Sequence, residues 1–283
     1  MRPLIQEIQT AHTPESLVKE MRDSEFGARN LILLRTLQFD SSSARYSFVA
    51  ANPFLTIRSF GSRCVITPHS TFRAPHFGNP WHLLDSLMSR FELLDEIDLP
   101  FPLGGAFGYW GYDLKNFTEP KLPRRAVNDL ELPDCHVGFY DSLVVFDHQL
   151  GKIFIVSTGL NSDGSRSEVR AKAQLDFWNA KLTEKELPQR HRGTELKNNA
   201  DSLRLCASVA EIASNLSRAG FIAAVERAQK YIRAGDIYQV NLSQRLTAQC
   251  DLSGWEMFEK LSAVSPAPFS AYLDCGQFEI ASS

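Results

Sequence analysis

The sequence predicts an α+β fold in which antiparallel sheets pack against separate helices. Two patterns favour this class: some segments alternate apolar and polar residues between turns, and others place apolar residues at helical spacing. Of the 283 residues, 43% are hydrophobic and 22% are charged, as in an ordinary globular protein. A chain of this size can bury one large core or two smaller ones.

The first part of the chain is expected to form a short helix followed by strands. Thr13 and Pro14 mark the helix start, because threonine is a favoured N-cap and proline fits the first helical turn. Apolar runs and alternating residues then predict strands over 31–34, 46–49 and 54–57.

Helical spacing and a hairpin pattern mark the middle of the chain. Apolar residues at helical spacing predict a helix over 81–94. Two apolar runs, 142–146 and 153–156, flank a polar turn and predict a β-hairpin. A further helix is expected over 175–182.

A polar segment divides the chain in two. Residues 183–202 contain almost no apolar side chain, which is typical of a linker between domains. We therefore expect an N-terminal domain over residues 1–185, a linker over 186–204 and a second domain that begins at 205 and runs to 283.

The second domain is expected to open with a helix. Ser217 can cap its first turn, and Gly235 is well placed as its C′ residue, since glycine readily adopts the left-handed conformation that ends many helices. The elements that follow are expected to be a strand, a helix and a hairpin, over residues 238–244, 255–261, and 269–273 with 278–280.

Composition excludes several functions. The formal net charge of −3 gives no overall attraction for nucleic acid or for an anionic membrane. No stretch approaches the roughly 18 uninterrupted apolar residues of a membrane span, so we expect a soluble, cytoplasmic protein. The seven histidines and five cysteines show no metal-ligand spacing, and no metal site is expected within these residues.

A glycine-rich stretch over 103–113 contains the pattern GxxGxxG, which is also found in phosphate-binding loops. Such a loop needs a strand before it and an apolar helix after it. Here Pro100 and Pro102 precede the glycines and a polar segment follows them. The favoured interpretation is that small residues let aromatic strands pack closely.

Three separated stretches form one set of motifs: residues 44–53 (ARYSFVAANP), residues 104–114 with 132–134 and 140–141, and residues 234–245 (AGDIYQVNLSQR). Together they resemble component I of the chorismate-using aminating enzymes, aminodeoxychorismate synthase and anthranilate synthase. The resemblance spans nearly the whole chain. It implies an anthranilate synthase component I-like fold, in which the third stretch opens a chorismate-binding domain that is incomplete at Ser283.

The resemblance also implies a reaction. In this family, ammonia released from glutamine by a separate amidotransferase subunit replaces a chorismate hydroxyl, and Mg²⁺ holds the substrate carboxylate. Asn241 and residues 267–272 (APFSAY) resemble the aminodeoxychorismate synthase forms, so synthesis of 4-amino-4-deoxychorismate for para-aminobenzoate and folate is expected. The alternative is anthranilate synthase of tryptophan biosynthesis.

The family's other landmarks are expected beyond Ser283. These are the P-I-K-G-T motif with its lysine, the acidic Mg²⁺ ligands and the general acid. The 283 residues alone are therefore expected to be inactive, and at most a non-catalytic binding module.

Gln239 is the candidate catalytic residue of this chain. Related enzymes that use water carry a lysine at this position, where it acts as the base. Glutamine takes no proton at neutral pH but can hydrogen-bond ammonia, which needs no base. The alternative is a strand residue that bonds a neighbouring backbone group. Gly235 is the candidate for close backbone approach to the substrate, although helix capping explains it equally well.

The resemblance finally implies a pocket for tryptophan across the two domains, built from Arg45, Tyr46, Ser47, Pro268 and Phe269. The chain departs from the family here, because Arg35 and Thr36 replace the Glu-Ser pair of anthranilate synthases. Arg35 would repel the ligand's ammonium if it pointed into the pocket. The alternative is that these residues are only core strands.

Overall fold

The structure is a computed structural model that describes residues 2–24, 28–37, 44–67, 75–93, 97–123, 128–183 and 212–283. Contacts divide the chain into two units, one of residues 1–186 with 254–283 and one of residues 187–253. The predicted linker over 186–204 lies outside the described residues. Residues 254–283, which were expected in the second domain, group with the first unit because their strands pair with a strand near the N-terminus.

The first unit contains a seven-stranded sheet in which every strand is antiparallel to its neighbours. Its order is β1 (Leu4–Ile8), β10 (Lys152–Ser157), β9 (Ser142–Asp147), β3 (Tyr46–Ala50), β2 (Ile32–Thr36), β13 (Phe269–Asp274) and β14 (Glu279–Ser282). The predicted hairpins of 142–146 with 153–156 and of 269–273 with 278–280 are confirmed as β9–β10 and β13–β14.

Three helices cover one face of this sheet: α1 (Pro14–Asp23), α4 (Glu168–Thr183) and α7 (Gly254–Val264). Their apolar side chains, among them Leu17, Trp178 and Phe258, form one core with inward-facing strand residues such as Leu33 and Tyr272. Thr13 caps α1 as expected, because its hydroxyl accepts a hydrogen bond from the Ser16 backbone and Pro14 occupies the first turn.

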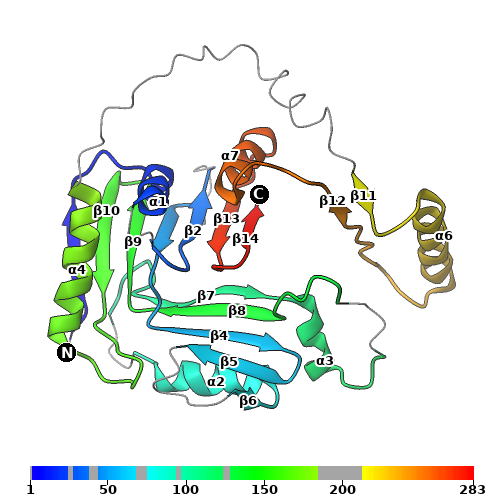
Figure 1. Cartoon of the computed structure of the whole chain (residues 1–283), viewed down its shortest axis with the longest axis horizontal. Helices are drawn as coiled ribbons and strands as arrows, with labels where there is room; N and C mark the ends of the chain where they lie inside the picture. Colours follow the sequence, from blue (N-terminus) through cyan, green and yellow to red (C-terminus); the bar gives the residue numbers. More distant parts are fainter. Residues whose placement is uncertain are drawn as a thin grey trace, which may run out of the picture. The chain divides into compact units, whose positions relative to one another are not determined.

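A five-stranded antiparallel sheet lies against the other face of the seven-stranded sheet (Figure 1). Its order is β6 (His76–Phe77), β5 (Arg63–Thr67), β4 (Leu55–Phe60), β8 (Cys135–Tyr140) and β7 (Gly105–Trp110). Side chains from both sheets, such as Tyr140, Val145 and Leu273, make up the core between them. The face of the five-stranded sheet that is turned away packs on α2 (Pro80–Arg90) through Leu84 and Leu87.

The glycines of the 103–113 stretch allow β7 to lie close to β8, as the sequence interpretation proposed. A Cβ atom on Gly108 would lie 2.0 Å from the carbonyl oxygen of His136, and one on Gly104 would lie 2.5 Å from that of Tyr140. Side chains at these two positions would therefore collide with the neighbouring backbone. After β7 the chain forms a 3-10 turn, η1 (Tyr112–Leu114), and the short helix α3 (Lys115–Thr118).

The second unit contains α6 (Arg218–Ala234) and a two-stranded ladder of β11 (Ala213–Ser214) and β12 (Leu246–Thr247). Ser217 caps α6, and Gly235 ends it in the left-handed conformation with φ of 78°, so both capping predictions are confirmed. The predicted strand over 238–244 is wrong. Isolated strands need a partner, and the described part of this unit pairs only β11 with β12.

The predicted α+β class with antiparallel sheets and packed helices is therefore confirmed. Within the described residues, no helix is both long enough and apolar enough to cross a membrane.

Candidate functional site

A cavity of about 360 Å³ lies where β2, β3 and β13 meet. It is lined by Leu34, Arg35, Thr36, Tyr46, Phe48, Phe269, Ser270, Ala271 and Ser282. Two residues of the predicted tryptophan pocket, Tyr46 and Phe269, line this cavity. The pairing of Phe269 with Thr36 across β13 and β2 brings these distant segments together.

The other predicted pocket residues hold the strands instead of lining the cavity. Ser47 accepts a hydrogen bond from the Thr36 backbone nitrogen (3.0 Å), and its hydroxyl lies 2.7 Å from His148 Nε2. The carbonyl of Pro268 accepts a hydrogen bond from the Leu37 backbone nitrogen (3.2 Å). The hydroxyl of Ser47 is thus already engaged within the protein.

Arg45 forms an ion pair with Asp147, which is 2% exposed in its side chain. Arg45 Nε lies 2.9 Å from Asp147 Oδ1, and Arg45 Nη2 lies 2.5 Å from Oδ2. Burial by itself raises the pKa of Asp147, but hydrogen bonds from Arg45 and from the Leu150 and Gln149 backbones leave that pKa below its ordinary value. Arg45 therefore clamps the start of β3 to the end of β9.

Arg35 borders the cavity, but its guanidinium group is directed toward the helices. Arg35 Nη1 lies 3.1 Å from Glu15 Oε1 of α1, and the group stacks 4.9 Å from the ring centre of Phe258 in α7. Successive side chains of a strand point to opposite faces, and Leu34 packs in the core between the two sheets. Arg35 was expected to repel a ligand's ammonium group only if its side chain pointed into the pocket. Its guanidinium group points toward the helices instead, so this repulsion is not expected.

Among the residues that the structure describes, no carboxylate lines the cavity, and this sets the result that we expect for tryptophan. Glu15 is paired with Arg35 and Asp147 with Arg45, so neither is free to bind the ligand's ammonium group. We expect calorimetry of the 283-residue chain to show no binding of L-tryptophan up to about 1 mM, since a desolvated unpaired ammonium is costly. Micromolar affinity would contradict this expectation.

The two remaining candidate residues, Gln239 and Gly235, belong to the second unit. Gln239 is exposed, and its Nε2 lies 3.4 Å from Asn241 Oδ1. The alternative of a strand residue bonded to backbone is not supported, because Gln239 lies outside a strand and its hydrogen-bond partner is a side chain. The role of Gln239 toward ammonia and that of Gly235 toward substrate stay predictions.

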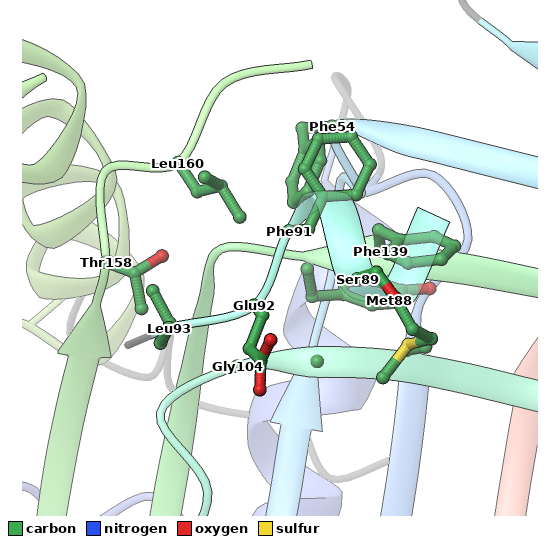
Figure 2. Close-up of a pocket in the computed structure, with 13 residues that line it drawn as sticks. Phe54, Met88, Ser89, Phe91, Glu92, Leu93, Gly104, Phe139, Thr158 and Leu160 are labelled. Atoms are coloured by element: carbon green, nitrogen blue, oxygen red, sulfur yellow. The ribbon is translucent and has the colours of Figure 1, made fainter. Parts of the chain in front are cut away.

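Sequence reasoning missed a second cavity, of about 410 Å³, beside the start of β7. Figure 2 shows Leu93, Thr158 and Leu160 on one side of it, and Met88 and Phe139 on the other. Phe54, Phe91 and Phe139 pack edge to face in its wall, with ring centres 5.1 to 6.3 Å apart. Of the residues that line this cavity, the glycine pair at 104–105 stood out in the sequence, and these glycines were interpreted as small residues that let strands pack closely.

The described residues do not supply a metal centre. Within them, no group of three or more His, Cys, Asp or Glu side chains is placed to hold a metal ion. The family resemblance places the Mg²⁺ ligands beyond Ser283, so Mg²⁺ binding stays a prediction and no chemical step through that ion is derived from the described residues.

A family model described as chorismate binding enzyme matches residues 35–283. The chain is 31% identical over 272 residues to anthranilate synthase component 1 of Acetivibrio thermocellus, covering 96% of the chain and 53% of that protein. It is 30% identical over 253 residues to aminodeoxychorismate synthase component 1 of Escherichia coli strain K12, covering 89% and 49%.

A solved structure has a similar fold. Anthranilate synthase component I from Streptococcus pneumoniae TIGR4 matches with a TM-score of 0.63 at 25% identity, covering 87% of this chain and 51% of that one. The chain thus spans about half the length of the curated relatives it matches.

Proposed function

Because the chain belongs to the family of chorismate binding enzymes, we propose that it is the N-terminal part of aminodeoxychorismate synthase component I. Overall identity does not separate this enzyme from its sister, since 31% and 30% are nearly equal. The observation that carries the proposal is the cavity between β2, β3 and β13, where the described lining residues include no carboxylate for an amino-acid effector. The resemblance of Asn241 and residues 267–272 to the aminodeoxychorismate synthase forms supports the same enzyme.

The proposed reaction replaces the 4-hydroxyl of chorismate with an amino group. Ammonia, supplied from glutamine by an amidotransferase subunit, forms the new carbon–nitrogen bond. The carbon–oxygen bond breaks, and the hydroxyl leaves as water after it gains a proton. Gln239 would contribute a neutral amide that hydrogen-bonds ammonia without protonating it.

The test uses the protein encoded by the full reading frame that contains this chain. Chorismate, Mg²⁺ and saturating ammonium chloride are supplied, and products are separated by chromatography. We expect 4-amino-4-deoxychorismate and no anthranilate. Anthranilate as the only product would contradict the proposal and support the alternative below.

Anthranilate synthase component I is the second candidate. It is favoured by the Acetivibrio thermocellus relative, which matches 96% of the chain. This candidate predicts both anthranilate formation and tryptophan binding. It is supported only if the product assay detects anthranilate and the calorimetry detects bound tryptophan.

A further inference from the structure

A groove runs between α2 and β7 at one edge of the five-stranded sheet. Two neighbouring cavities of about 410 and 600 Å³ form it, and both are lined by Met88 and Ala106. The first is the aromatic cavity of Figure 2, and the second lies between Trp81 and Asp85 of α2 and Trp110 of β7. We call the two together the α2–β7 groove.

In the part of the chain that the structure describes, β7 forms the edge of the sheet beside this groove. β7 is the last strand in the order β6-β5-β4-β8-β7, so only β8 pairs with it among the described residues. A strand at a sheet edge presents backbone N–H and C=O groups that can pair with another strand. Since a six-residue strand extends about 20 Å, a segment of similar length could pair along β7.

The groove also presents apolar side chains. Met88 is 50% exposed and Trp110 is 44% exposed, and both line it. Phe107 and Tyr109 of β7 instead pack on Tyr140 and Phe278 at the opposite face of the sheet. Because strand residues alternate between faces, every second side chain of a strand added to β7 would enter the groove.

The charged lining is acidic. Asp85 and Glu92 are exposed and line the two cavities, and no lysine or arginine is among the described residues that line them. Opposite charges across an interface favour encounter and select partners. A bound segment would therefore carry basic side chains, and an anionic polymer such as a nucleic acid does not fit.

We infer that the α2–β7 groove binds an extended segment of a partner protein, which joins β7 as a sixth strand of the sheet. Strand addition of this kind takes its affinity from backbone hydrogen bonds and its specificity from pockets for alternate side chains. The segment places apolar side chains against Met88 and Trp110, and lysine or arginine near Asp85 and Glu92. This surface is independent of the proposed reaction.

The test uses a fluorescein-labelled decapeptide that alternates valine and lysine, mixed with the 283-residue chain. We expect saturable binding by fluorescence anisotropy, with slower hydrogen exchange at the β7 amides. The double variant Asp85→Lys/Glu92→Lys should bind this peptide on the order of tenfold more weakly and should gain binding of a valine–glutamate peptide. Asp176→Lys, an exposed change on α4, is the matched control and should alter neither.

Three results would overturn the inference. The first is that no valine–lysine peptide binds. The second is that a peptide N-methylated on alternate amides binds equally well or that β7 exchange is unchanged, since either excludes a backbone ladder. The third is a dimer in sedimentation whose β7 amides are protected without peptide, which would assign the edge to a second copy of the chain.

Discussion

Replacing Arg170 by leucine should lower the free energy of unfolding of the 283-residue chain by about 3 kcal/mol or more at neutral pH. The chain passes from β8 into β9 at Asp141, and so from one sheet to the other. Arg170 of α4 binds this 2% exposed carboxylate through Nε (2.8 Å to Oδ2) and Nη2 (3.0 Å to Oδ1). Leucine would leave a buried charge without its partner.

The loss of unfolding free energy in Arg170→Leu should increase as the pH rises. Burial raises the pKa of Asp141, and the hydrogen bonds and charge of Arg170 oppose that rise. Without Arg170 the folded-state pKa rises further. A carboxyl group with a raised folded pKa loses stability as pH increases through the interval between its unfolded and folded values. The difference between wild type and Arg170→Leu should therefore be larger near pH 7 than near pH 4.

Urea unfolding at both pH values measures this difference, with two control variants. Lys172→Leu removes an exposed cation from the same helix and should change the unfolding free energy by no more than about 0.5 kcal/mol. The double variant Asp141→Asn/Arg170→Leu removes the buried charge and should recover much of the loss. An equal loss at both pH values would show that packing of the Arg170 side chain, and not charge, is responsible.

Much of the fold follows from local signals that the sequence displays directly. Thr13 and Pro14 fix the start of α1, and Gly235 fixes the end of α6, because these residue types satisfy or permit specific backbone geometry. The residues within a strand do not show which distant strand it pairs with. No local signal near residue 269 indicates that β13 pairs with β2, and so the sequence placed the C-terminal hairpin in the second domain, whereas its contacts group it with the first unit.

The error over residues 238–244 has a related cause. Alternation of apolar and polar residues describes which side chains could share a face, but a strand also needs a neighbour to accept its hydrogen bonds. Tyr238 is 99% exposed, and no strand among the described residues pairs with the segment 238–244.

The candidate site was predicted in part. The motif at 44–53 and the segment at 267–272 identified two strands that do line one cavity, through Tyr46 and Phe269. The direction of the Arg35 side chain depends on the strand register and on Glu15 of α1, which the motif did not contain. The α2–β7 groove combines a helix, a sheet edge and loops that share no sequence pattern, so no motif predicts it.

Gln239 is the residue whose proposed role can be tested by a single change in the complete enzyme. This hypothesis rests on the proposed function and on the match of residues 234–245 to the family signature. A neutral amide can hydrogen-bond ammonia, whereas a lysine places a cation beside it. If the site is desolvated when the enzyme is complete, the lysine pKa falls toward neutrality and the amine can act as a base toward water.

We expect Gln239→Lys to lower the rate of chorismate amination on the order of 10²-fold, because small displacements of a reacting group are costly. Part of the lost flux should reappear as a hydroxylated product. Both products are measured from chorismate with saturating ammonium, in the enzyme encoded by the full reading frame. Gln229→Lys, which introduces the same cation at an exposed position of α6, is the control and should leave amination within about twofold. Unchanged amination by Gln239→Lys, with no hydroxylated product, would show that Gln239 does not position the nucleophile.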